Sequence, residues 1–443
     1  MISIAQIEQA VREVLEEEAN PLARETGFIQ RERNFSGAEF AQLLIFGWLQ
    51  NGQASLEELS QVAQEVEVTL SAPALSQRFT RQCADFMRRL FERLAQKRMR
   101  AEAVEIPLLR RFTAVVIEDS SSITLPAQLA DVWRGCGGRG KSSKAALKLH
   151  TRWDVLSGEL QGPLLTDGRL ADARSPFKEQ PLSAGSLFLA DLGYFHLAWL
   201  LQQAQAGVSW LMRLKGGTVL LTKKGQHRLK LLGVLPRQVG AVIDLGVLVG
   251  VQSRIPARLI AQRVPKEVVK QRRERLEEEA KDKGQEVSQE QWELAQWTIV
   301  ITNVPTHKLS VPEALILMRL RWQIELLFKL WKQKGLLDEW RSKNPWRILC
   351  ELYGKLSAML IQQWLLVLGC WHDPHRSLVK ASQVVRRAGQ RLLAGLTPQG
   401  DFTSVVQSIV RQMRSGCRLN TRKKRPTTSQ LLLNGLDWFV LTP

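Results

Sequence analysis

The chain has 443 residues, and 62 Lys and Arg side chains outnumber 43 Asp and Glu, leaving a formal charge of +19. A charge of this sign predicts an anionic partner such as nucleic acid, although a ribosome-associated or membrane-surface protein would also be basic. The five cysteines are scattered without a CxxC pair, so neither a zinc site nor a disulfide framework is indicated.

The apolar stretches do not have the character of targeting or membrane segments. Met1–Glu18 is charged and lacks the apolar centre of a signal peptide. Leu352–Trp371 is the most apolar stretch, but Lys355, Gln362 and Gln363 interrupt it, which predicts a buried helix rather than a membrane span. We therefore expect a cytoplasmic protein without a membrane partner.

Residues 1–105 are predicted to be helical throughout. Ser36–Leu49 is one amphipathic stretch, and Ser55–Val66 with Ala72–Gln96 would form a pair of helices joined by a short turn. The second helix of the pair carries several arginines: Arg78, Arg81, Arg88, Arg89 and Arg93. A helix-turn-helix that reads DNA would have this pattern, and so would a plain helical bundle with basic faces.

Two short apolar runs further along the chain each end in an acidic residue. Val115–Ile117 precedes Glu118 and Asp119, and Leu187–Ala190 precedes Asp191. Each run predicts a buried strand with a carboxylate at its C-terminal end. Carboxylates at the edge of an apolar sheet are usually paired, protonated or neutralised by a cation, because they repel one another and are costly to desolvate.

The loop Gly135–Ser142 matches the GxxxxGK[ST] pattern of phosphate-binding loops. That motif works only between a strand and a helix, whereas apolar and polar residues alternate over 147–155 and predict a strand. We interpret the loop as a basic connection between two strands, in which Lys141 and Lys144 can contact DNA phosphates. ATP hydrolysis is the rival enzymatic activity.

A long insertion separates Asp191 from the next candidate acid, Glu325, and exceeds what one crossover helix requires. Val208–Val264 is rich in Val, Leu and Gly with repeated turn signals, which predicts a small, mostly β subdomain. Pro265–Lys283 is densely charged and predicts a solvated helix.

The stretch from Ser310 to Lys332 predicts one helix, because Ser310 and Glu313 form a capping box at its start. One carboxylate and three cations share a narrow stripe of this helix: Arg321, Glu325, Lys329 and Lys332. An apolar face adjoins the stripe: Leu320, Ile324, Leu327, Phe328 and Trp331. The stripe suits phosphates and a metal ion, and a solvated face with ion pairs is the alternative.

These motifs together resemble the bacterial insertion-sequence DDE transposases that carry the YREK signature: Tyr, two residues, Arg, three residues, Glu, six residues, Lys. Arg321, Glu325 and Lys332 match it in register, whereas Met318 stands at the Tyr position. Met318 lacks the hydroxyl that in the family helps to hold a DNA-end phosphate. The resemblance covers about residues 115–332, with the termini similar in character only.

The resemblance implies the residues of the site. Asp119, Asp191 and Glu325 would be the catalytic triad and would bind two Mg²⁺ or Mn²⁺ ions. Asp244 is a rival second acid, and Asp191 is preferred because the β-rich insertion that follows the second acid contains Asp244. Three cations would contact DNA phosphates: Arg321, Lys329 and Lys332.

In the family that the sequence resembles, a Trp at a set distance before the Glu stacks on a base flipped out near the transposon end. Trp297 lies at that distance before Glu325 and would take this role. A Trp of the hydrophobic core is the alternative. The implied reaction cuts one strand at each end, forms and opens a hairpin, and transfers the ends to target DNA. The implied partners are double-stranded DNA, both transposon ends and target, and a second copy of the chain in a synaptic homodimer.

The expected fold is α/β, with an RNase H-like core that contains an inserted β subdomain and is flanked by helical regions. The expected domains are residues 1–105 (helical, DNA-binding), 106–215 (first part of the core), 216–305 (insertion), 306–345 (second part of the core) and 346–443 (helical, with a basic tail). The basic run Arg418–Arg425 would grip DNA or form a solvated loop. The alternative function is a domesticated or inactive relative that binds DNA without cutting, to which Met318 points.

Overall fold

The computed structural model describes residues 1–31, 35–137, 144–225, 227–236, 238, 240–282, 284–420 and 428–434. The chain forms two compact units, each built from separate segments. The first unit contains Met1–Glu105, Asp119–Phe177 and Gln323–Thr421; the second contains Ile106–Glu118, Lys178–Trp322 and Arg422–Pro443. Strand β1 (Val115–Leu125) and helix α12 (Trp322–Gln333) each begin in the second unit and end in the first.

The first unit is mostly helical, as predicted for residues 1–105. Its N-terminal helices are α1 (Ile4–Arg12), α2 (Ala19–Glu25), α3 (Gly37–Gln50), α4 (Leu56–Val62), α5 (Ala72–Arg78) and α6 (Arg81–Gln96), with a π-helical turn, Glu13–Glu17, between α1 and α2. Its C-terminal helices are α13 (Pro345–Cys370), α14 (Leu378–Arg387), α15 (Gly389–Leu396) and α16 (Phe402–Ser415).

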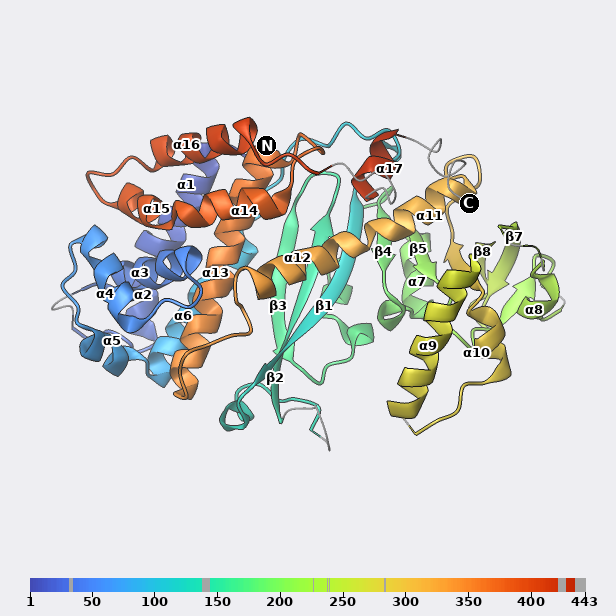
Figure 1. Cartoon of the computed structure of the whole chain (residues 1–443), viewed down its shortest axis with the longest axis horizontal. Coiled ribbons are helices and arrows are strands. Elements are labelled where there is room, and N and C mark those ends of the chain that lie inside the picture. Colours follow the sequence, from blue (N-terminus) through green and yellow to red (C-terminus); the bar gives the residue numbers. More distant parts are fainter. Residues whose placement is uncertain are drawn as a thin grey trace. The chain divides into compact units, whose positions relative to one another are not determined.

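Helix α13 forms the centre of the first unit. Asn344 caps it by accepting the backbone N–H groups of Trp346 and Arg347, and Pro345 occupies its first position. Almost all of its remaining side chains are buried against α3, α6, α14 and α16 (Figure 1). The apolar stretch Leu352–Trp371 is therefore an interior helix, as predicted. Within the described ranges, no helix combines the length and the apolar character needed to cross a membrane.

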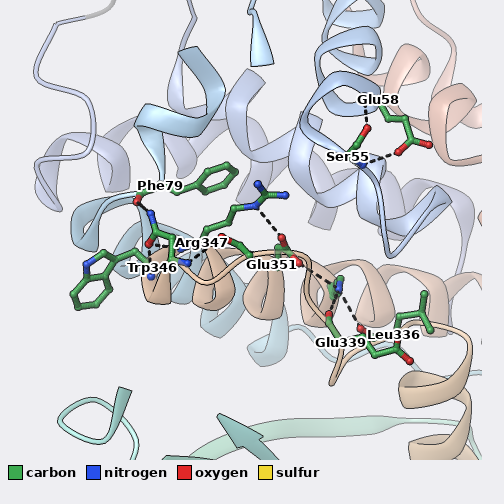
Figure 2. A network of polar contacts seen from close by, with 11 residues as sticks. Ser55, Glu58, Phe79, Leu336, Glu339, Trp346, Arg347 and Glu351 are labelled. Carbon is green, nitrogen blue, oxygen red and sulfur yellow. Dashed lines mark hydrogen bonds and ion pairs between the residues drawn. The ribbon is translucent and has the colours of Figure 1, made fainter. Parts of the chain in front are cut away.

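A buried ion network fastens the segment between α12 and α13 to α13 (Figure 2). The Lys355 side chain is only 1% exposed, and its Nζ donates to the carbonyl oxygens of Leu336 (3.1 Å) and Glu339 (2.6 Å). The Glu351 carboxylate lies 3.7 Å from Lys355 and accepts a hydrogen bond from Arg347 at 3.0 Å. Burial lowers the pKa of Lys355, and the Glu351 charge opposes that shift.

The first unit also contains strands. β2 (Ala145–Asp154) pairs antiparallel with β3 (Leu160–Asp167), and the strand order is β3-β2-β1. β2 confirms the strand that was predicted from the alternation over 147–155. The buried His150 on β2 has Nε2 2.9 Å from the Thr166 hydroxyl, and burial lowers the pKa of His150 to about 4.

The second unit is organised around a mixed sheet in the order β1-β4-β5-β9-β8-β7-β6. The strands are β4 (Leu187–Ala190), β5 (Ser209–Arg213), β6 (Leu220–Thr222), β7 (Val242–Val249), β8 (Ile255–Arg263) and β9 (Trp297–Thr302). β1, β4 and β5 are parallel, and the pairs from β5 through β9 to β6 are antiparallel. The strands within residues 216–305, the predicted insertion, thus extend the same sheet through the pairing of β9 with β5.

The helices of the second unit are α7 (Leu197–Gln205), α8 (Leu231–Val234), α9 (Lys266–Asp282), α10 (Gln289–Leu294), α11 (Val311–Leu320) and α17 (Thr428–Asn434). α9 has no buried residue, which confirms the solvated helix that was predicted from the charged run Pro265–Lys283. The main apolar cluster of this unit joins residues of β4 and β5, such as Phe188 and Trp210, to residues of β7 and β8.

Replacing Lys355 by Met should lower the free energy of unfolding by about 3 to 5 kcal/mol, because the buried Glu351 loses a cationic neighbour and two carbonyls lose their donor. Urea unfolding followed by tryptophan fluorescence measures this change. The exposed Lys343→Met variant is the control for loss of one positive charge. Equal stability of the two variants would contradict a structural role for the network.

His150 should make stability depend on pH below its ordinary pKa of 6.5. The unfolded chain binds a proton at His150 below pH 6.5, whereas the folded chain does not bind it until about pH 4. The free energy of unfolding therefore decreases as the pH is lowered from 6.5 to about 4. The loss is up to roughly 3 kcal/mol. Urea unfolding at pH 7.5, 6 and 5 should show a shallower pH dependence for His150→Gln, and an unchanged one for the exposed His372→Gln.

Candidate active site

Asp119 lies within β1 rather than at its end. Val115–Ile117 are buried as predicted, but the strand continues to Leu125. Beyond Asp119 the burial alternates, with Ile123 and Leu125 inside and their neighbours outside, which is the period of a half-buried strand. The prediction that this strand ends at Asp119 is therefore wrong, because a second, alternating pattern follows the apolar run directly.

Asp191 follows the last residue of β4, as predicted. β1 and β4 are parallel, with Glu118 opposite Ala190. Asp119 therefore follows Glu118 directly, and Asp191 follows Ala190 directly. Strands in parallel register present their C-terminal ends at the same edge of a sheet.

The surroundings of Asp119 in the first unit are polar and ordered by hydrogen bonds. The Ser120 backbone N–H donates to Asp119 Oδ1 at 2.8 Å, and the Ser120 hydroxyl donates to Asp172 Oδ1 at 2.7 Å. Lys148 Nζ donates to the same Asp172 oxygen at 3.1 Å and to the carbonyl of Leu170 at 2.5 Å. Lys148 and Asp172 were not predicted as site residues, because no local sequence pattern distinguishes them.

The predicted long helix is divided at Arg321 into α11 and α12. Arg321 keeps helical dihedral angles (φ −48°, ψ −34°), so only the hydrogen-bonding pattern is interrupted. The predicted capping box between Ser310 and Glu313 is present. Arg321 is 5% exposed, with its guanidinium carbon 5.9 Å from the centre of the Trp322 ring, and Met318 is buried in α11. The prediction of one uninterrupted helix is therefore wrong, although the helical direction is kept at the break.

Helix α12 carries the other members of the predicted stripe. The predicted apolar face is buried throughout: Leu320, Ile324, Leu327, Phe328 and Trp331. Glu325 is partly exposed and Lys329 is exposed. Lys332 Nζ donates to the carbonyl oxygen of Ser122 at 2.9 Å. In the first unit, α12 is therefore bonded to β1 three residues beyond Asp119.

Trp297, the predicted base-stacking residue, opens β9 opposite Arg263 and is 8% exposed. Its carbonyl oxygen accepts a hydrogen bond from Arg272 of α9 at 2.7 Å, and Arg272 also donates to the Thr298 hydroxyl at 2.8 Å. The side chain is therefore packed into the second unit, and stacking on a base would require the ring to be uncovered.

A second tryptophan of the insertion, Trp292 of α10, lies beside an open cavity of about 450 Å³ between α9 and α10. The guanidinium carbon of Arg273 lies 4.4 Å from the centre of the Trp292 ring, and Arg263, Lys266 and Lys270 also line the cavity. Trp292 was not among the predicted site residues, although an aromatic residue next to a basic run is a recognisable signal.

The basic loop differs from a phosphate-binding loop. Lys141 lies outside the described residues. Lys144 is exposed, and its carbonyl oxygen accepts the Gly135 N–H at 2.8 Å, which closes the base of the loop. The residues after Lys144 form β2, so the described residues on that side do not provide the helix N-terminus that a phosphate-binding loop requires.

The arginines of α6 are engaged within the helical bundle. Arg88 and Arg89 both contact the Asp85 carboxylate, at 2.7 and 3.1 Å, and Arg93 lies 3.2 Å from Glu18. These pairs favour the helical-bundle interpretation of α6 over a helix whose arginines all face a DNA groove. Part of the basic tail, Arg422–Arg425, lies outside the described residues.

The rival acid Asp244, on β7, has a structural role. Arg258 of β8 binds its carboxylate through two nitrogens, at 3.0 and 2.6 Å, and also donates to the carbonyl oxygens of Val304 and Leu309. A bidentate pair of this kind holds neighbouring strands together. Asp244 is therefore committed to the packing of the insertion, which agrees with the preference for Asp191.

The oxygen donors of Asp119, Asp191 and Glu325 are of the type that Mg²⁺ and Mn²⁺ prefer, so the donor chemistry fits the expected ions. Asp119 and Glu325 belong to the first unit and Asp191 belongs to the second. In the part of the chain that the structure describes, no three His, Cys, Asp or Glu side chains gather as ligands for one ion.

Comparison with known proteins identifies relatives along most of the chain. The transposase for insertion sequence element IS231C from Bacillus thuringiensis subsp. berliner is 28% identical over 360 residues, which cover 77% of this chain and 75% of that one. The transposase for insertion sequence element IS421 from Escherichia coli is 28% identical over 357 residues, covering 78% and 89%.

Among solved structures, a synaptic complex of the piggyBac transposase with hairpin DNA aligns with 95% of this chain and 83% of that chain, at 11% identity and a TM-score of 0.48. This score is too low to establish a common fold.

The family described as "Transposase DDE domain" matches residues 110–361. The match includes Asp119, Asp191 and Glu325 and extends over more than half of the chain. The chain therefore belongs to the family of transposases with a DDE domain.

Proposed function

We propose that this protein cleaves the ends of an insertion sequence and transfers them to target DNA by metal-dependent phosphoryl transfer. The observation that carries the proposal is the family match over residues 110–361, which contains all three candidate acids in the expected order. Relatives that match about three quarters of the chain are transposases for insertion-sequence elements, which supports DNA ends of that kind as the substrate.

Asp119, Asp191 and Glu325 are proposed as the catalytic and metal-binding residues. Support for the two aspartates comes from the parallel register of β1 and β4, because Asp119 and Asp191 directly follow the pair Glu118 and Ala190. Support for Glu325 comes from α12, which is bonded to β1 through Lys332. Two bound Mg²⁺ or Mn²⁺ ions would supply an activated nucleophile and stabilise the leaving oxygen.

The proposed contacts to DNA phosphates come from cations on or near α12 and from the basic loop: Arg321, Lys329, Lys332, Lys141 and Lys144. Lys329 and Lys144 are exposed and can reach a phosphate as they stand. Arg321 is buried, so its charge would act on DNA only through a local rearrangement or at longer range. We also propose a homodimer that holds two DNA ends, and a location in the bacterial cytoplasm, where the relatives' insertion-sequence DNA would be found.

A hairpin intermediate is proposed from the resemblance to the YREK group, with Trp297 stacking on a flipped base. Met318 leaves this step without the Tyr hydroxyl of the signature. That substitution favours one alternative, a relative that binds DNA ends without completing the reaction.

Asp119→Asn and Glu325→Gln should each abolish cleavage of labelled DNA that carries the element's inverted repeats, with Mg²⁺ or Mn²⁺ present and no nucleotide. DNA binding should be largely kept, because each change removes one carboxylate charge and leaves the side-chain shape intact. Gel-shift and cleavage assays measure the two effects, and the exposed Asp131→Asn is the matched control.

Three results would contradict the catalytic assignment. Loss of DNA binding together with cleavage would indicate a structural role for the carboxylate. Binding by the wild type without cleavage under either metal would favour the non-cleaving alternative. Activity that appears only with ATP would favour the rival reading of the Gly135–Ser142 loop.

Trp297→Leu should spare the first nick and impair hairpin formation, because Leu fills much of the same buried space but offers no aromatic face to a base. Denaturing gels separate nicked from hairpin products. Equal loss of both products would remove the stacking role. Loss of the hairpin in Trp292→Ala, with the hairpin kept in Trp297→Leu, would instead assign the stacking to Trp292.

A further inference from the structure

A hydrogen-bonded polar cluster that the proposed function leaves unused lies beside Asp119 in the first unit. It consists of Ser120 on β1, Lys148 on β2 and Asp172, which opens a short 3-10 turn (Asp172–Arg174). Asp172 Oδ1 accepts two hydrogen bonds, from the Ser120 hydroxyl at 2.7 Å and from Lys148 Nζ at 3.1 Å. The first of these bonds connects residues 52 positions apart in the chain.

We propose that Asp172, held by Lys148, is a positioning residue that orients the Asp119 carboxylate through Ser120. This inference rests on the proposed function, because it takes Asp119 to be a metal ligand. The bonds run from Lys148 to Asp172, from the Ser120 hydroxyl to Asp172, and from the Ser120 amide to Asp119 Oδ1.

The geometry of a strand explains why such an anchor is effective. Successive side chains point to opposite faces of a strand, so the Ser120 hydroxyl anchors β1 from the face opposite to the Asp119 carboxylate. Holding Ser120 fixes the orientation of its peptide N–H, and that N–H donates to Asp119 Oδ1. The anchor therefore limits the directions that the Asp119 carboxylate can adopt.

Lys148 holds Asp172 in place. Its side chain is 12% exposed, and besides Asp172 its Nζ binds the carbonyl oxygen of Leu170, which ties the turn that carries Asp172 to β2. The hydrogen bond from the Lys148 ammonium to Asp172 Oδ1 holds the same oxygen that accepts the Ser120 hydroxyl. Partners of this kind, which orient a metal ligand from behind, typically change metal affinity by about 10- to 100-fold when they are removed.

The test compares Asp172→Ala and the conservative Asp172→Asn with a matched control, Asp167→Ala. Asp167 lies in the same unit, and its side-chain exposure is 34% against 32% for Asp172. Its carboxylate lies 3.7 Å from Arg169 and accepts the Arg134 N–H at 2.9 Å. Mn²⁺ binding to the full chain is followed by the electron paramagnetic resonance signal of free Mn²⁺. The Mn²⁺ concentration for half-maximal DNA cleavage is measured in parallel.

Asp172→Ala should raise the Mn²⁺ concentration for half-maximal binding and the Mn²⁺ concentration for half-maximal cleavage, each by about tenfold or more. Excess Mn²⁺ should restore cleavage. Asp172→Asn should show a smaller shift, because its amide oxygen still accepts the Ser120 hydroxyl. Asp167→Ala should behave like the wild type. The proposal is overturned if Asp172→Ala matches Asp167→Ala in both measurements, or if its cleavage falls equally at every Mn²⁺ concentration with Mn²⁺ binding unchanged.

Failure of the proposed function would look different. In that case the wild type would show no saturable Mn²⁺ binding, or Asp119→Asn would bind Mn²⁺ as well as the wild type does. Neither result depends on an Asp172 variant, so the two ideas can fail separately.

Discussion

Parallel pairing between β1 and β4 is the constraint on which the rest of the structure depends. Parallel strands are covered on both faces, and the paired residues Val115–Ile117 and Leu187–Ala190 are apolar; the buried Glu118, opposite Ala190, is the exception. Asp119 and Asp191 directly follow the last pair, Glu118 and Ala190. β1 then continues into the first unit. Its buried residues Val115–Glu118 belong to the second unit, and the less buried residues from Asp119 onward belong to the first.

In the first unit, two sets of contacts hold helix α12: one to strand β1 and one to the segment that follows α12. Lys332 ties the helix to the carbonyl oxygen of Ser122 on β1. Beyond the C-terminus of α12, the buried Lys355 holds the connecting segment by the carbonyls of Leu336 and Glu339. Buried charges are tolerated only with partners, and here Glu351 and the two carbonyls supply them. The contacts of Lys332 and Lys355 therefore contribute both to the stability of this unit and to the placement of Glu325 on α12.

Burial changes the meaning of several residues that were candidates for function. Arg321 fits the YREK pattern that the sequence resembles but is buried beside Trp322, and Trp297 is covered in β9 with its carbonyl bound by Arg272. Asp244 looks like a rival acid in the sequence, yet Arg258 engages both of its oxygens. Conversely, Trp292 was not predicted as a site residue, although it borders a cavity lined with cations.

The sequence by itself determined what depends on near neighbours: the capping box at Ser310, the buried runs before Asp119 and Asp191, the interior helix α13 and the solvated helix α9. Helical and strand periods are local, so they can be recognised without a fold. Tertiary structure decided the continuation of β1 to Leu125, the break at Arg321 and the link from Lys148 through Asp172 to Ser120. Such contacts depend on which distant segments meet, and no local pattern records that.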